Sequence, residues 1–197
     1  MNSAEFLALL EQTGAVESGH FQLSSGRHSP TYVQCARFLQ DPNLAAAACG
    51  ALAERFRQQN VQVVVAPALG GIVVAHEAGR ALGTRALFAE RVEGRFALRR
   101  SLTIDPGERV LIVEDVVTTG GSTREIAELV KSYGGTIVGV GALVDRGGTA
   151  ASPCPWRFEA LIALDVPTYA PADCPQCAQG DPVAKPGSRP TPALTSR

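Results

Sequence analysis

The sequence is short of lysine and has no excess charge of either sign. Only two of its eighteen basic residues are lysines, Lys131 and Lys185, and the other sixteen are arginines. Nineteen acidic residues oppose them, which leaves a net charge of −1. A basic excess is typical of proteins that bind nucleic acid or an anionic membrane surface, so we expect neither kind of partner.

Long apolar runs and a disulfide pattern are also missing. The longest apolar stretch, residues 61–75, is interrupted by Pro67 and the Gly70-Gly71 pair, which excludes a membrane span. The first five residues offer neither the basic nor the apolar region of a signal peptide. Five scattered cysteines do not indicate a disulfide framework. We therefore expect a cytoplasmic protein.

The amino-acid composition is typical of one compact domain with a hydrophobic core. Hydrophobic residues make up 45% of the 197 residues and charged residues 19%. The patterns predict helices over 3–13, 41–60, 70–83 and 122–135, with Ser3 as the first N-cap, and strands over 61–67, 85–91, 108–115, 136–145 and 158–166. This order predicts an α/β fold with a mainly parallel twisted sheet flanked by helices.

The most informative segment is VLIVEDVVTTGGST, residues 110–123. Four apolar residues form a buried strand, Glu114 and Asp115 follow at its carboxyl end, and Gly120-Gly121 lead into the next helix. Ligands of doubly wound sheets bind beyond the carboxyl ends of the strands. A glycine-bearing loop that enters a helix N-terminus offers free N–H donors and a positive dipole end to an anion. The segment predicts a site for a single phosphate.

The two carboxylates and the glycine spacing argue against common nucleotide sites. Glu114 and Asp115 would repel a polyphosphate, and they are better suited to ribose hydroxyls and to positive charge developing on a sugar ring. No lysine stands where a G-x-x-x-x-G-K-[ST] loop requires one, which disfavours an NTPase. Gly139-x-Gly141 lacks the third glycine of a dinucleotide fingerprint, which disfavours a Rossmann oxidoreductase.

Residues 110–123 resemble the phosphoribosyl-diphosphate (PRPP) motif of type I phosphoribosyltransferases; the alternative is a chance Gly-Thr turn after a strand. The resemblance implies the fold of that family with a small N-terminal hood. We expect one structural domain made of a hood at 1–60, a PRPP-binding core at 61–167 and a tail at 168–197. The residues implied to bind PRPP are Gly70, Arg91, Glu114, Asp115, Val116, Val117, Thr118, Thr119, Gly120, Gly121 and Ser122.

Two further segments concern the base. Residues 25–32, SGRHSPTY, are similar to a segment of orotate phosphoribosyltransferases, and residues 144–148 resemble the strand-end arginine segment of the same family. Orotate carries a carboxylate, which an arginine can bind in bidentate fashion, and a flat ring, which an aromatic wall can cover. The resemblance implies that orotate contacts Thr118, Arg146, His28 and Tyr32. In the alternatives, His28 is an exposed turn residue, Tyr32 belongs to the core and Arg146 is a salt-bridge partner.

The sequence departs from the family at two places. Gly70 stands where well-known members carry a lysine, and the lysine and histidine of the mobile lid have no counterparts. Residues 92–107 read as a long loop, which is usually functional in a compact domain. Arg91 matches a basic lid position, and the neighbouring arginines that also qualify as diphosphate contacts are Arg95, Arg99 and Arg100.

The resemblance implies Glu114, Asp115 and Arg91 as catalytic residues. It implies Mg²⁺ bound mainly through PRPP and water, with no metal held by the protein alone. It also implies a homodimer in which each lid reaches the neighbouring site. Two other functions stay open: salvage of a purine or uracil by the same chemistry, and a non-catalytic PRPP sensor.

A lone C-x-x-C motif, Cys174 to Cys177, lies in the proline-rich tail. Zinc requires two more ligands, and the sequence around the motif supplies none. We therefore expect no metal or redox role for it, and we expect the isolated His20 and His76 to be structural.

Overall fold

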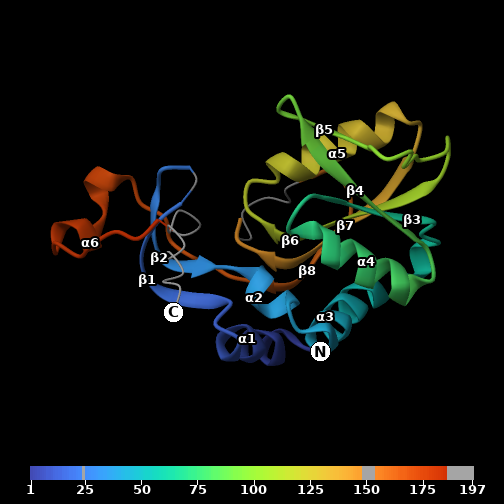
Figure 1. Ribbon diagram of the computed structural model, residues 1–197. Helices are drawn as coiled ribbons and strands as arrows, with labels where there is room; N and C mark the ends of the chain where they lie inside the picture. Colours follow the sequence, from blue (N-terminus) through green and yellow to red (C-terminus); the bar gives the residue numbers. More distant parts are fainter. Residues whose placement is uncertain (24, 148–153, 186–197) are drawn as a thin grey trace, which may run out of the picture. The chain divides into compact units, whose positions relative to one another are not determined.

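The computed structural model describes residues 1–23, 25–147 and 154–185, and these divide into two units (Figure 1). The core unit comprises Met1–Ala15 and Gln34–Asp165. The hairpin unit comprises residues 16–33 together with the chain from Val166 onward, described as far as Lys185. Residues 34–60 thus pack into the core unit, while residues 16–33 join the chain from Val166 onward.

A six-stranded sheet in the order β5-β4-β3-β6-β7-β8 forms the centre of the core unit. The pairs β3–β4, β3–β6, β6–β7 and β7–β8 are parallel, and only β4–β5 is antiparallel among them. The predicted mainly parallel sheet is therefore confirmed. The strands are β3 Val63–Pro67, β4 Arg85–Val92, β5 Arg95–Ala97, β6 Arg109–Val117, β7 Thr136–Asp145 and β8 Phe158–Ala163.

Helices cover both faces of this sheet, with α5 on one side and α3 and α4 on the other (Figure 1). Alternate residues of a strand point to opposite faces, so β6 serves both layers. Val110 and Ile112 pack with Ile126 and Val130 of α5. Leu111, which lies between them in the strand, faces the opposite layer. The helices of the core unit are α1 Ser3–Gln12, α2 Cys35–Leu39, α3 Pro42–Glu54, the 3₁₀ turn η1 Arg57–Gln59, α4 Gly71–Leu82 and α5 Gly121–Ser132.

All four predicted helices are present, with shifts at their ends. The N-cap of α1 is Asn2, whose side chain accepts from the Glu5 N–H at 2.9 Å while Glu5 accepts from the Asn2 N–H, so the predicted Ser3 cap is wrong. The Ser3 hydroxyl instead donates to the Leu161 carbonyl at 2.8 Å. Helix α4 ends at Gly83, which adopts φ +72°, as predicted. No helix among the described residues has the length and apolar character needed to cross a bilayer.

We expected a long loop over residues 92–107, but part of this Arg-rich stretch forms a β-hairpin. In this hairpin β4 pairs with β5, and Arg91 lies opposite Phe96. Glu93 and Gly94 make the connection with φ values of +50° and +83°. Two successive residues with positive φ form the turn that matches the twist of paired strands.

The hairpin unit is built from two distant parts of the chain. Strands β1 Val16–Gln22 and β2 His28–Val33 pair antiparallel. The C-terminal segment, with η2 Pro171–Asp173 and α6 Pro175–Ala178, adds one backbone bridge to each strand. Ala184 pairs with Phe21, and Tyr169 pairs with His28 through two hydrogen bonds of 2.9 Å.

Candidate functional site

The candidate site lies at the carboxyl edge of the core sheet, where the connections after β3, β6 and β7 begin. Strand β6 ends at Val117, and Gly120 turns the chain into α5 with φ +69°. A residue with a side chain is strained in that conformation, which explains the glycine. The order of strand, carboxylates, glycine turn and helix N-terminus agrees with the prediction from residues 110–123.

The N-terminus of α5 is suited to hold an anion. In the part of the chain that the structure describes, no side chain caps this helix at Gly120. The first N–H groups of a helix have no partner within it, and they carry the positive end of the helix dipole. Arg124 donates from Nη1 to the Thr119 carbonyl at 2.8 Å, which fixes the loop in front of the helix. Together these groups form a phosphate-sized donor set.

Glu114 and Asp115 point to opposite faces of the sheet, because they are consecutive residues of β6. Glu114 is buried on the side of α5, and Thr123 donates to its Oε1 at 3.5 Å. Burial, followed by repulsion from Asp115, raises the pKa of Glu114 to about 8. Burial also raises the pKa of Asp115. A site that disfavours both negative charges is prepared to receive a positive one.

Gly70 allows the loop after β3 to pass close to Asp115. A Cβ atom at residue 70 would lie 2.6 Å from Oδ2 and 2.7 Å from Oδ1 of Asp115. Gly70 has φ −56°, so the requirement is for space rather than for an unusual backbone conformation. A side chain at residue 70 would therefore displace the Asp115 carboxylate.

Thr118 and Arg146 follow neighbouring strands, and the structure brings their segments together. The Arg146 N–H donates to the Val117 carbonyl at 2.7 Å, which continues the β6–β7 pairing beyond the end of β7. A Cβ atom at Gly147 would lie 2.5 Å from the Thr118 carbonyl oxygen. The predicted pair is therefore adjacent beside the phosphate loop. Gly148, the last residue of the predicted arginine segment, lies outside the described residues.

Three of the four arginines predicted to contact diphosphate, Arg91, Arg99 and Arg100, form ion pairs within the chain. Arg91 donates through both terminal nitrogens to Glu125 at 3.0 and 3.1 Å, and its guanidinium lies 4.1 Å from the centre of the Phe96 ring. Glu125 raises the pKa of Arg91. Glu90 forms ion pairs with Arg100 at 2.9 Å and with Arg99 at 3.9 Å. All three arginines are well exposed, so these pairs contribute little to stability and can exchange for a ligand.

The two remaining residues predicted to contact orotate, Tyr32 and His28, belong to the hairpin unit. The half-buried ring of Tyr32 packs 5.7 Å from that of Phe21. His28 is buried rather than an exposed turn residue, and its Nδ1 lies 2.9 Å from Nε2 of His20. Arg27 is held by Thr168, with hydrogen bonds of 2.9 and 2.6 Å.

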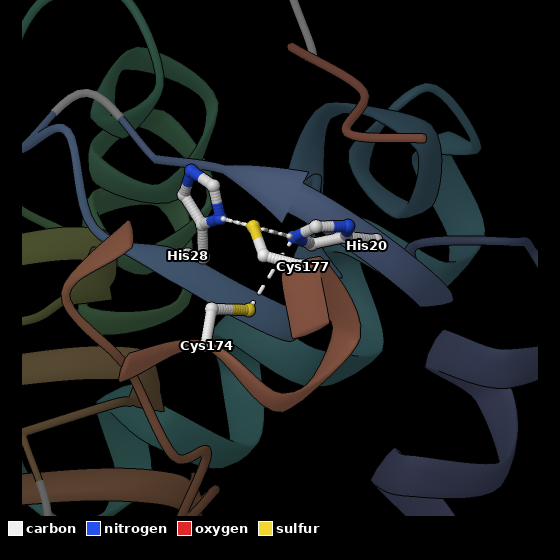
Figure 2. A group of neighbouring side chains, drawn as sticks. All are labelled: His20, His28, Cys174 and Cys177. Carbon is white, nitrogen blue, oxygen red and sulfur yellow. Dashed lines mark hydrogen bonds between the residues drawn. The ribbon is translucent and has the colours of Figure 1, made fainter. Parts of the chain in front are cut away.

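One group of residues was not predicted from the sequence. No further ligands stand near Cys174 and Cys177 in the sequence, yet both lie beside His20 and His28 in the hairpin unit (Figure 2). The histidines precede the cysteines by about 150 positions, so proximity in sequence could not reveal them. Only the C-x-x-C spacing was a signal, and it was discounted for lack of partners.

Comparison with known proteins identifies the family of this architecture. Residues 35–162 match the phosphoribosyl transferase domain. The chain is 53% identical to the orotate phosphoribosyltransferase of Desulforamulus reducens, with 96% of this chain and 98% of the relative covered. It is 50% identical to that of Thermotoga maritima, with 92% and 96% covered. The crystal structure of orotate phosphoribosyltransferase from Aeropyrum pernix superposes with a TM-score of 0.69 at 29% identity, covering 80% of this chain and 92% of that one.

Proposed function

The chain belongs to the orotate phosphoribosyltransferases, and from this premise we propose how its residues carry out the reaction. The enzyme transfers the 5-phosphoribosyl group of PRPP to orotate and releases diphosphate. The bond between the anomeric carbon and the diphosphate oxygen breaks, a bond to a ring nitrogen of orotate forms, and the proton of that nitrogen passes to water or to the released diphosphate. The observation that carries the assignment of roles is the adjacency of Arg146, Thr118 and the phosphate loop at one sheet edge.

The 5-phosphate binds at the N-terminus of α5. The uncapped N–H groups behind Gly120 and the hydroxyls of Thr118, Thr119 and Ser122 supply its donors. Val116 and Val117 contribute backbone at the same edge, as the family resemblance implies. This end of the substrate does not react, so its binding energy serves to position the anomeric carbon.

Glu114 and Asp115 hold the ribose hydroxyls and face the positive charge that develops on the sugar ring. Both carboxyls are desolvated, as their raised pKa values indicate. A carboxylate in a dry site interacts more strongly with developing charge than one in water. The approach of the cationic ring favours their ionised forms, which stabilises the transition state relative to the free enzyme.

Arg146 binds the carboxylate of orotate, and Thr118 contacts the ring beside it. An anionic ring needs no strong general base, so orienting it against the anomeric carbon is the main task of these residues. Tyr32 supplies the flat apolar wall. Arg146 also gives the site its preference, because an uncharged base offers the guanidinium no carboxylate to bind.

Mg²⁺ fits the donor chemistry of this edge. It prefers oxygen ligands and keeps several waters, and the carboxylates of Glu114 and Asp115 are oxygen donors whose charge a cation would compensate. Bound with PRPP, mainly through substrate oxygens and water, the ion would supply positive charge to compensate that of the diphosphate. Isothermal titration of PRPP with and without Mg²⁺ tests this; equal affinity in both titrations would contradict it.

The β4–β5 hairpin closes over the diphosphate and excludes water. Arg91, Arg95, Arg99 and Arg100 supply the positive charge, and in a homodimer they reach the neighbouring site. Mixing an Asp115→Asn variant with an Arg99→Ala, Arg100→Ala variant tests the arrangement. Random exchange of subunits should restore about one quarter of wild-type activity, because half of the dimers then carry one intact site. No recovery after demonstrated exchange would place lid and site in the same subunit.

The assignment of orotate is tested by following the loss of orotate absorbance with PRPP and Mg²⁺, with uracil, adenine and hypoxanthine in parallel by diphosphate release. We expect turnover of orotate alone. Arg146→Ala should raise the KM for orotate on the order of 100-fold, as loss of a bidentate charged contact does. Arg80→Ala, which removes an exposed arginine of α4, is the control. An unchanged KM in Arg146→Ala would remove Arg146 from base recognition.

A further inference from the structure

Four side chains in the hairpin unit form the chemistry of a metal centre that the transfer reaction does not use. The candidate ligand atoms of His20, His28, Cys174 and Cys177 all lie within 4.8 Å of one another. The histidines come from β1 and β2, and the cysteines from the C-terminal segment around α6, with all four side chains turned toward a common centre (Figure 2). We propose that these residues bind one structural Zn²⁺ ion.

Hydrogen bonding alone does not account for the arrangement. His20 Nδ1 lies 3.0 Å from the Asp181 carbonyl, which can only accept, so Nδ1 carries the proton and Nε2 presents its single lone pair. Three groups surround that lone pair: His28 Nδ1 at 2.9 Å, Cys174 Sγ at 3.4 Å and Cys177 Sγ at 3.6 Å. A single lone pair can accept a hydrogen bond from only one of these three groups. A cation placed between the four atoms would satisfy all of them together.

The spacing is close to that of a tetrahedral zinc site. Zn–N bonds of about 2.0 Å and Zn–S bonds of about 2.3 Å place nitrogen and sulfur ligands about 3.6 Å apart, and two nitrogens about 3.3 Å apart. Three of the four nitrogen–sulfur distances in the cluster are 3.4, 3.6 and 3.2 Å, and the fourth, between His28 and Cys174, is within 4.8 Å. The two ring nitrogens, at 2.9 Å, need to separate by only a few tenths of an ångström.

The donor set and its support select zinc over Mg²⁺. Two thiolates and two imidazoles are soft or borderline ligands, whereas Mg²⁺ requires oxygen. The hydrogen bond from His20 to the Asp181 carbonyl fixes the tautomer that exposes Nε2, as outer contacts of zinc histidines do. His20, His28 and Cys174 are all at least nine-tenths buried. With four protein ligands the site has no open position, which is typical of a structural centre.

The ion would join the two distant segments of the hairpin unit. Backbone bridges already tie the C-terminal segment to the strands at Tyr169 and Ala184, and the cysteines lie between these two points. Small units with little apolar core commonly depend on a metal for stability. His28 then serves as a ligand rather than as an orotate contact. The consequence for orotate, which rests on the proposed function, is that zinc fixes the segment that carries Tyr32.

Metal content is measured on protein without a polyhistidine tag, purified under a reducing agent that does not chelate metals. We expect about one zinc per chain. The Cys174→Ser, Cys177→Ser double variant should lose it, while Cys154→Ser and His76→Gln should retain it, because Cys154 and His76 lie outside the cluster. Replacement by Co²⁺ should give the intense visible bands of a tetrahedral ion and a charge-transfer band from thiolates. These readouts do not depend on catalysis.

A second experiment covers the case in which the double variant does not fold. Wild-type protein is treated with a chelator, and alkylation of the exposed Cys177 is followed by mass spectrometry with and without added Zn²⁺. We expect zinc to slow alkylation at least tenfold. The proposal is overturned if reduced wild-type protein takes up neither Zn²⁺ nor Co²⁺. Metal retained equally by the folded double variant, or a Cys174–Cys177 disulfide that binds no metal after reduction, overturns it as well.

Discussion

Replacing Glu114 by glutamine should stabilise the free enzyme, and the gain should depend on pH. Glutamine has the shape of a protonated glutamic acid and cannot ionise. In the folded protein, burial and then the neighbouring Asp115 raise the pKa of Glu114 from 4.5 to about 8. Between these values the folded chain therefore binds more protons than the unfolded chain. Stability of the wild type falls as the pH rises through this window, and the loss is complete above pH 8.

The size of the effect follows from the same shift. Each pKa unit corresponds to about 1.4 kcal/mol, so the free energy of unfolding of Glu114→Gln should exceed that of the wild type by on the order of 5 kcal/mol at pH 9. At pH 5 the wild-type side chain is protonated in the folded state, and the two proteins should differ by less than about 1 kcal/mol. Catalysis should still fall, because the variant lacks the carboxylate that faces the sugar ring.

Urea unfolding at pH 5, 7 and 9, in the absence of PRPP, measures these differences. Glu128→Gln is the matched control, because Glu128 lies on the surface of α5 with a side chain that is 73% exposed. A difference between Glu114→Gln and the wild type that is the same at pH 5 and pH 9 would refute the argument. It would mean that Glu114 is solvated or paired in the folded state.

Three further predictions concern the same sheet edge. Asp115→Asn should lower kcat/KM by about tenfold to a thousandfold, the equivalent of about 1.4–4 kcal/mol of lost contact, and wild-type turnover would exclude Asp115 from the mechanism. Gly70→Ala should raise the KM for PRPP by displacing the Asp115 carboxylate, whereas Gly50→Ala, where a Cβ meets nothing within 4 Å, should have no effect. Glu125→Ala should lower the KM for PRPP about two- to fivefold by releasing Arg91 from an exposed ion pair; a KM that rises would show that the pair assists binding.

Strong hydrophobic patterns predicted the core sheet and its main helices well. Strands such as residues 63–67 and 109–117 are nearly continuous apolar runs, which is what burial on both faces of a parallel sheet requires. Short elements were missed, because five residues such as Cys35–Leu39 show too little periodicity to distinguish a helix turn from a loop. The β4–β5 hairpin was missed because Glu93-Gly94 is not one of the residue pairs that commonly mark such turns.

Some features of the candidate site could be predicted from the sequence, and others could not. The phosphate loop is contiguous in sequence, so its spacing could be recognised directly. The closeness of Gly70 to Asp115 and the partnership of Arg91 with Glu125 depend on how separate elements pack, and no local pattern encodes them. The proximity of His20 and His28 to Cys174 and Cys177 also depends on packing between distant segments, so it could not be predicted from the sequence.

The construction of the hairpin unit from two distant segments has a consequence for the order of synthesis. By the time residue 165 has left the ribosome, every strand of the core sheet has emerged. At that stage β1 and β2 still lack Tyr169 and Ala184, the residues that bridge them to the C-terminal segment. We expect a chain interrupted there to form the phosphate-binding edge before the hairpin unit is complete. Pulse-labelled nascent chains would then resist proteolysis in the core before residues 16–33 become protected.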